Sequence, residues 1–175
     1  MGHPGKVKII FDNGKTIQYY NHYAHWTVLG FFLVRDIRIL LSKHQTNGNS
    51  PSSAIPQIVE LLKNIKVVEE SSTPTPEEIE KLKQYADLRV SRRSYEDWYC
   101  LLNKTFDSLI SVIECGYVLD HPYSQDYNFI IDFDKDMFKI EAQYEKLNDI
   151  TFKLTNIPED WMAQMEYKEV NERIQ

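Results

Sequence analysis

The chain has little cysteine and no long apolar segment. Cys100 and Cys115 are its two cysteines in 175 residues, and they form neither a CxxC pair nor, with histidine, a zinc-finger spacing. A chain of this length can bury a core without disulfides, so the thiols indicate a reducing compartment and buried positions. No run approaches the roughly 18 apolar residues of a membrane span, and the N-terminus lacks the apolar region of a signal peptide. We expect an intracellular protein, cytoplasmic or nuclear, without a membrane partner.

Signatures of common catalytic and cofactor sites are missing from the sequence. It contains no P-loop, GxSxG or GxGxxG motif. The run Asp132–Asp136 imitates the start of a calcium loop, but Met137 and Gln143 stand where such a loop needs glycine and a bidentate glutamate. We interpret this run as a hairpin turn with solvated acids. Removal of Met1 would expose Gly2, which has no nucleophilic side chain. The sequence therefore weighs against an enzyme and predicts no metal and no cofactor.

Charge is unevenly distributed along the chain. The net charge is −6, yet residues 1–48 hold six lysines or arginines and two acids. An acidic protein disfavours indiscriminate phosphate binding, although a local basic face can still exist. The aromatic content of 13% is typical of a chain that packs an ordered core.

The first half of the chain predicts a hairpin followed by helices. Residues 6–11 and 16–20 read as strands around Asn13-Gly14, because both residues tolerate the positive φ of a type I′ turn. Apolar residues three and four apart predict a helix over 26–43 and another over 55–65. Residues 44–53 have the composition of a loop, and residues 69–75 that of a linker.

The second half predicts short helices and then strands. Thr75 and Pro76 mark a helix over 76–89 with a capping box. Helices around 98–102 and 109–115 follow, and Gly116 is a C-cap candidate. Further strands are expected at 127–133, 137–142 and 149–154, then a helix from 158, and residues 167–175 are expected to fray. These elements predict one α+β domain over 1–175, with an antiparallel sheet built from the N-terminal and C-terminal hairpins and helices between and packed over it. Whether the 69–75 linker permits motion, and the oligomeric state, stay open.

Several short segments carry a family resemblance. They are Met1, Gly2 and Gly5, then Tyr20-Asn21-His22-Tyr23, Leu29-Gly30, Tyr127–Asp134 and Phe138–Glu141. Together they resemble a family of small, largely uncharacterised fungal, bacterial and phage proteins that begin M-G-T-R-G and continue Y-N-H-aromatic-D-S-Y-P. The early Arg of that family corresponds to Pro4, its Asp corresponds to Ala24, and its Pro is missing. The resemblance implies an architecture rather than a reaction. The lost charged groups favour binding or a scaffold over catalysis.

The stretch from Tyr19 to Gly30 concentrates four aromatic residues, two histidines and an asparagine between a predicted strand and a predicted helix. Aromatic side chains are enriched at protein interfaces. We therefore predict a non-enzymatic protein–protein interaction module, an adaptor or complex subunit, with a protein partner. Its predicted binding residues are Tyr19, Tyr20, Asn21, His22, Tyr23, His25, Trp26 and Trp161.

An alternative is a small-molecule binder or hydrolase-like enzyme with a pocket at Tyr20–His25. It requires these groups to converge with Asp132 or Tyr127 from the late hairpin. A metal at His22 and His25 would need a third ligand, for which His3 and His121 are candidates. The simpler interpretation is that Asn21 and His22 hydrogen-bond the backbone where strand turns into helix.

A further alternative is single-stranded nucleic-acid binding, because basic and aromatic residues are interleaved near the N-terminus. The residues concerned are Lys6, Lys8, Lys15, Tyr19, Tyr20, Tyr23 and Trp26. The competing interpretation is that alternate strand residues simply face core and solvent.

Overall fold

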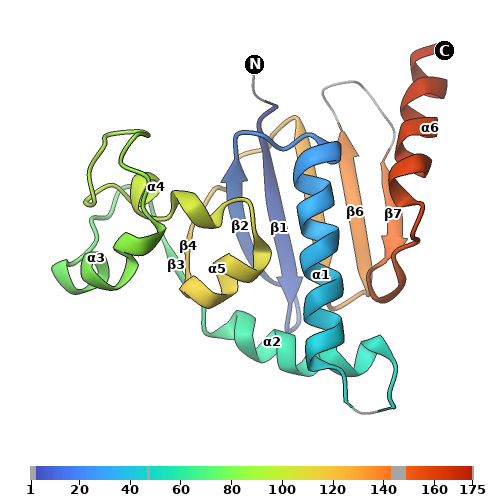
Figure 1. Ribbon diagram of the computed structural model, residues 1–175, viewed down its shortest axis with the longest axis horizontal. Coiled ribbons are helices and arrows are strands. Elements are labelled where there is room, and N and C mark those ends of the chain that lie inside the picture. The colour runs from blue at the N-terminus through green and yellow to red at the C-terminus, as the bar shows by residue number, and fades with distance from the viewer. Residues whose placement is uncertain (1–2, 47, 143–148, 175) are drawn as a thin grey trace.

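The structure is a computed structural model that describes residues 3–46, 48–142 and 149–174. A five-stranded sheet is covered by helices on one face, and a small lobe lies beside its edge strand β2 (Figure 1). The strands are β1 (Gly5–Phe11), β2 (Lys15–Asn21), β3 (Lys66–Val68), β4 (Tyr117–Leu119), β5 (Tyr127–Asp132), β6 (Met137–Ala142) and β7 (Ile150–Lys153). The α-helices are α1 (Phe31–His44), α2 (Ile55–Lys63), α3 (Pro76–Leu82), α4 (Trp98–Leu101), α5 (Leu109–Cys115) and α6 (Trp161–Ile174).

The sheet is mixed, with strand order β2-β1-β5-β6-β7. The two hairpins and the meander to β7 are antiparallel, which confirms the α+β class. They join through a parallel pair, β1 with β5, in which Gly5 lies opposite Tyr127. A hairpin pattern specifies only pairing between neighbours in sequence, so this contact was not predictable from it. The first turn is a three-residue loop rather than a two-residue type I′ turn, because Asp12, Asn13 and Gly14 all have positive φ and Phe11 pairs with Lys15.

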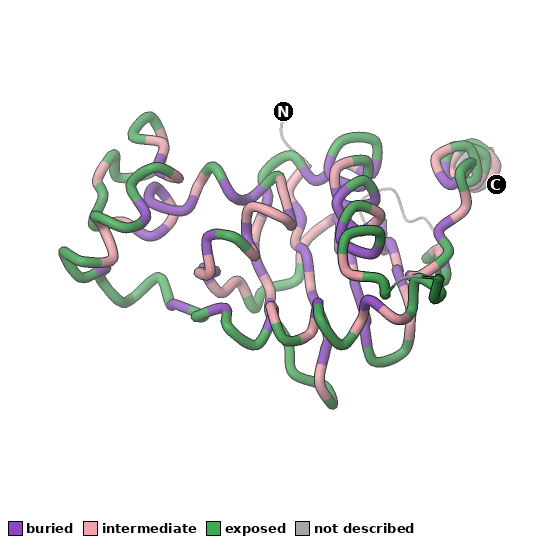
Figure 2. The backbone as a smooth tube through the Cα atoms, turned by 60° about the horizontal axis from the view of Figure 1, so that its bottom comes forward, coloured by how far each residue is buried: buried purple, intermediate pink, exposed green. Residues whose placement is uncertain are grey.

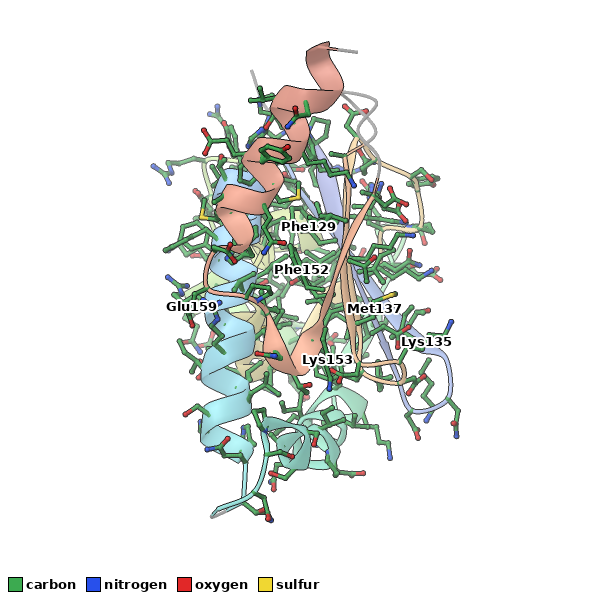
Figure 3. The ribbon with its side chains drawn as sticks, turned by 90° about the vertical axis from the view of Figure 1, so that its right-hand side faces the viewer. Phe129, Lys135, Met137, Phe152, Lys153 and Glu159 are labelled. Atoms are coloured by element: carbon green, nitrogen blue, oxygen red, sulfur yellow. The ribbon has the colours of Figure 1, made fainter. Side chains whose placement is uncertain are left out.

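The main hydrophobic core lies between the sheet and α1, α2, α5 and α6. Strand β1 alternates buried and half-buried residues along its length, as a sheet with one covered face requires. Seen from the side, Phe129 and Phe152 lie between the sheet and α1, whereas Lys135 and Met137 lie on the opposite side (Figure 3). The helix predicted over 26–43 begins as a π-helical turn, Trp26–Gly30, and continues as α1.

The small lobe, residues 66–119, has a hydrophobic cluster of its own, although Leu109 and Val112 of α5 pack into the main core. Buried positions occur in both parts of the molecule (Figure 2). The parallel pair β3–β4, two three-residue strands that the sequence did not predict, lies between β2 and the helices α3 and α4 (Figure 1). The capping box at Thr75 and the left-handed C-cap at Gly116 (φ 76°) are confirmed. Helix α3 ends at Leu82, earlier than predicted, because the chain turns through a 3₁₀ segment to bury Ala86 in the cluster. The linker 69–75 contains no helix or strand.

The acidic run after β5 is used by the backbone. Asp132 accepts a hydrogen bond from the Lys135 amide at 2.9 Å. Asp134 accepts from the amide of Gly14 at 2.8 Å, which fastens the first turn to the second. Asp136 accepts from the amide and hydroxyl of Thr155 at 2.9 and 2.8 Å. These acids therefore organise turns, although Asp134 is also exposed to solvent as predicted. Gln143 lies outside the described residues.

The C-terminal segment, in which fraying is predicted, is helical in its described part. Helix α6 continues through Ile174, and residue 175 lies outside the described residues. Trp161 and Met165 anchor its first turns in the main core. No helix in the described part of the chain is both long and apolar enough to cross a membrane.

Candidate functional site

Half of the predicted binding residues lie in the interior. Tyr19, Asn21, Trp26 and Trp161 are buried, Tyr20 and His25 are half-buried, and His22 and Tyr23 are exposed. The two tryptophans meet edge to face at 6.4 Å, and the indole nitrogen of Trp26 donates to Glu169 Oε2 at 3.1 Å. Burial raises the pKa of Tyr19. These four residues cannot contact a partner without rearrangement.

Asn21 connects β2 to the small lobe. Its Nδ2 donates to the carbonyl of Phe106 at 3.0 Å and to Asp107 Oδ1 at 2.8 Å. Its Oδ1 accepts from the amide of Tyr23 at 2.7 Å. His22 instead pairs through Nδ1 with the hydroxyl of Tyr20 at 3.0 Å. The expectation that both residues bind backbone therefore holds for Asn21 and is wrong for His22.

We call the stretch Tyr19–Gly30, where β2 passes into the π-helical turn, the corner. Its two histidines take different partners. The His25 side chain caps the π-helical turn, where Nδ1 accepts from the amide of Thr27 at 3.2 Å. Its ring packs at 5.3 Å against both His3 and Tyr127. The His22 ring packs on Tyr23 at 4.9 Å instead. In the described part of the chain, no three His, Cys, Asp or Glu side chains are placed to hold a metal ion.

Two glycines in the segments that carry the family resemblance allow close packing at this corner. A Cβ on Gly5 would lie 2.3 Å from Ala24 Cβ and 2.5 Å from the carbonyl oxygen of Tyr127. A Cβ on Gly30 would lie 3.1 Å from the Trp161 ring. Ala24 is fully buried, and its amide donates to the His3 carbonyl at 2.7 Å. These residues therefore act through packing.

A ring-lined pocket of about 200 Å³ lies where the small lobe meets β2. The Tyr20 ring lies 5.0 Å from the His121 ring and 6.3 Å from the Tyr99 ring. Tyr99 in turn packs on Phe106 at 5.4 Å. Tyr20 is the one predicted binding residue among those that line it. The lining residues are Tyr20, Glu70, Tyr99, Phe106, Leu119, Asp120 and His121.

Local structure fixes each wall of this pocket. Tyr20 projects from the face of β2 opposite the buried Tyr19, because side chains alternate along a strand. Tyr99 belongs to α4, which Asp97 caps. The third wall follows β4, and there the amide of Asp120 donates to the Val68 carbonyl at 2.9 Å. The next amide, that of His121, donates to the carbonyl of Gln18 in β2 at 3.2 Å.

The pocket combines neutral rings with two carboxylates. Burial lowers the pKa of His121, and the charge of Lys6 lowers it further, although Asp120 and Glu70 oppose the shift. Burial raises the pKa of Tyr20 and of Tyr99, so both phenols stay protonated at neutral pH. Within the described residues, neither Glu70 nor Asp120 forms an ion pair. Perturbed titratable groups gathered in a cavity are typical of functional sites.

A second hollow of about 480 Å³ adjoins the pocket and shares Glu70 and Asp120 with it. Tyr123 stands on its wall with 69% of its surface exposed, and its ring meets that of His121 at 5.4 Å. The residues that line this hollow are Glu69, Glu70, Ser71, Arg92, Asp120, Pro122 and Tyr123. We name the pocket and this hollow together the junction site.

Sequence reasoning missed most of the junction site because its walls come from separate stretches of the chain. The sequence offers His121 only as a candidate third metal ligand, and it places Glu70 in the predicted 69–75 linker. The signal that could have found it is the run Asp120–Tyr123, in which histidine and tyrosine flank a proline in a loop. Comparisons with known proteins add no assignment, because no family model, no curated protein and no solved structure matches this chain.

Proposed function

We propose that the protein is a non-enzymatic interaction module, an adaptor or complex subunit, whose protein partner docks at the junction site. The observation that carries this proposal is the ring-lined pocket, whose two carboxylates form no ion pair with another described residue and which opens beside the exposed Tyr123. Aromatic side chains at the centre of an interface supply most of its binding energy. The protein acts in a reducing compartment inside the cell, where its two thiols stay free.

The chemistry of the titratable groups supports binding over catalysis. Burial raises the pKa of the Cys100 and Cys115 thiols, and Cys100 donates to the Asp87 carbonyl at 3.0 Å, so neither sulfur is an activated nucleophile. His121 Nε2 is paired with the Gln125 amide at 2.7 Å. Glu70 and Asp120 are thus the charged groups that line the pocket, and the simplest role for them is to attract a cation.

The arrangement of the first hairpin gives little support to the alternative of single-stranded nucleic-acid binding. Lys6, Lys8 and Tyr20 do lie on the face of the sheet opposite the main core, because they alternate with buried neighbours. Tyr19 and Trp26 are buried on the other side and cannot stack on bases. A nuclease-treated sample in the experiment below separates this alternative from a protein partner.

The test is affinity purification of the tagged protein from its native cells, followed by direct titration of the recovered partner. Tyr123→Ala removes an exposed ring from the junction site, and Tyr167→Ala removes one that is 73% exposed on α6 as the matched control. We expect the control to bind the partner like the unmodified protein and Tyr123→Ala to bind about tenfold more weakly or worse. Equal binding by the two variants would refute the proposal. Trp26 is unsuitable for this purpose because its loss would test folding.

A further inference from the structure

We propose that the pocket of the junction site takes the ammonium group of a lysine side chain, presented by a basic segment of the partner. This inference rests on the proposed function and specifies the chemistry that the site recognises. It follows from the size of the pocket, the nature of its walls, its charge and the hollow beside it.

The size of the pocket suits a single side chain. Its volume of about 200 Å³ lies below the ~300–1,000 Å³ typical of sites for drug-sized ligands. A cavity of roughly 150 Å³ already holds a benzene molecule. A four-carbon stem with a compact ammonium head therefore fits, whereas a nucleotide or a cofactor of similar size does not.

The walls suit both parts of a lysine side chain. Phe106 and Leu119 give an apolar surface for the methylene stem. Tyr20, Tyr99 and the neutral His121 line the space with aromatic rings, and the Tyr20 ring lies 6.3 Å from the Tyr99 ring and 5.0 Å from the His121 ring. Cations bind over aromatic faces within about 6 Å of the ring centroid, more strongly where water is excluded.

The charges around the pocket favour a cation. Glu70 and Asp120 line it, and no lysine or arginine does among the residues that the structure describes. Lys6 interacts electrostatically with both Asp120 and His121 while its ammonium donates to Gln18 Oε1 at 2.8 Å, so one positive charge stands against the two carboxylates. Arg92 lines only the adjoining hollow. Because His121 is neutral at pH 7, it does not repel the incoming charge.

The adjoining hollow indicates a protein segment instead of a free amine. It is more than twice as large as the pocket, about 480 Å³, and continues from the same two carboxylates. Glu69 adds a third acid there, and Tyr123 offers a ring for packing. A segment that inserts one lysine can lay its neighbouring residues along this hollow, where acids complement a basic sequence.

The test uses two probes that differ in one group, titrated into the full chain and followed by NMR chemical shifts. N-acetyl-lysine methylamide carries the ammonium, and N-acetyl-norleucine methylamide has the same stem without it. We expect the lysine probe to shift resonances of Tyr99, Leu119 and His121, and to bind at least about fivefold more tightly than the neutral probe. Equal affinities, no binding, or shifts confined to another surface would overturn the inference.

Charge-neutralising variants provide the second readout. The pair Glu70→Gln and Asp120→Asn keeps the shape of both side chains and removes their charge. We expect the pair to weaken the lysine probe about five- to tenfold and to leave the neutral probe unchanged. Glu166→Gln, an exposed acid on α6, is the control and should change neither. Unchanged affinity in the pair would overturn the inference.

The two proposals can fail separately. If the lysine probe does not bind but Tyr123→Ala still loses the partner, the interaction module stands and the lysine assignment falls. If the lysine probe binds but the partner ignores Tyr123→Ala, the pocket recognises a free amine, and both the module and the lysine segment fall.

Discussion

The sheet region and the small lobe are built from elements of very different length. Strands β1 and β2 have seven residues each and α1 has fourteen, whereas β3 and β4 have three and α4 has four. Short strands and helices are unstable by themselves and depend on the surface that they pack against. The sheet region can therefore hold its own shape, while the small lobe needs its contacts with β2 and α1. The shape of the junction site therefore depends on how the lobe packs against the sheet region, because its walls come from both regions.

Directional polar contacts fix the lobe to the sheet region. Asp36 in α1 is buried, with 1% of its surface exposed. Its carboxylate accepts hydrogen bonds from the Ser108 hydroxyl at 2.8 Å and from the Ile110 amide at 3.3 Å. Asn21 makes the corresponding contacts from β2. Buried hydrogen bonds specify one arrangement, because a partner left unsatisfied costs more than the bond itself contributes. The geometry of the pocket thus depends on residues outside it.

The largest effect is expected in the sheet region. Phe129→Ala removes a fully buried ring from β5, and we expect the free energy of unfolding to fall by about 3–5 kcal/mol. Chemical denaturation, followed by fluorescence and by far-UV circular dichroism, measures the loss. Phe31→Ala is the control, since that ring is 48% exposed on α1, and it should cost about 1 kcal/mol or less. Similar losses for both variants would contradict a core centred on the sheet.

An intermediate effect is expected from loosening the lobe alone. Asn21→Ala leaves the Phe106 carbonyl and Asp107 without their donor, at a cost of about 1–3 kcal/mol. Hydrogen exchange should then accelerate in β3, β4 and α5 while β1 and β5 keep their protection. Asn156→Ala, at an exposed asparagine, should change neither region. Uniform acceleration would show that the two regions open as one unit.

The sequence predicted the features that are encoded locally. The first hairpin followed from Asn13-Gly14, and Thr75 and Gly116 marked the ends of helices, because turns and caps require particular residues within a few positions. The parallel pairing of β1 with β5 was not predictable, since it joins strands more than a hundred residues apart. Three-residue strands such as β3 leave too little periodicity to recognise.

The candidate site was predicted less well than the fold. An aromatic run can face the core or the solvent, and only the register of β2 decides that Tyr20 faces outward and Tyr19 inward. Trp26 and Trp161 are buried because α6 returns to cover the corner, which no local pattern indicates. Glu70, Tyr99 and His121 meet only because the small lobe docks on β2.

The smallest effect concerns His121, which lies where the two regions meet and whose protonation makes stability depend on pH. Its pKa in the folded protein lies below the ordinary 6.5, because the ring is buried and Lys6 is near. As pH falls past about 6.5, the unfolded chain takes up a proton before the folded protein does. Because the unfolded state then binds more protons, the free energy of unfolding falls until the pH passes the lowered pKa of the folded protein. The stability that neutral His121 contributes is therefore fully present only above pH 6.5.

Denaturation of the unmodified protein and of His121→Gln between about pH 7.5 and 5.5 measures this term. We expect the loss of stability on acidification to be smaller in His121→Gln than in the unmodified protein. The control is His22→Gln, which removes an exposed histidine that does not line the pocket, and it should lose as much stability as the unmodified protein. Acidification should also weaken the lysine probe, because a protonated His121 adds a positive charge to a pocket whose carboxylates attract one. If stability depended on pH identically in His121→Gln and in His22→Gln, the His121 ring would be solvated in the folded protein. The lobe would then not be closed over β2 tightly enough to form the pocket.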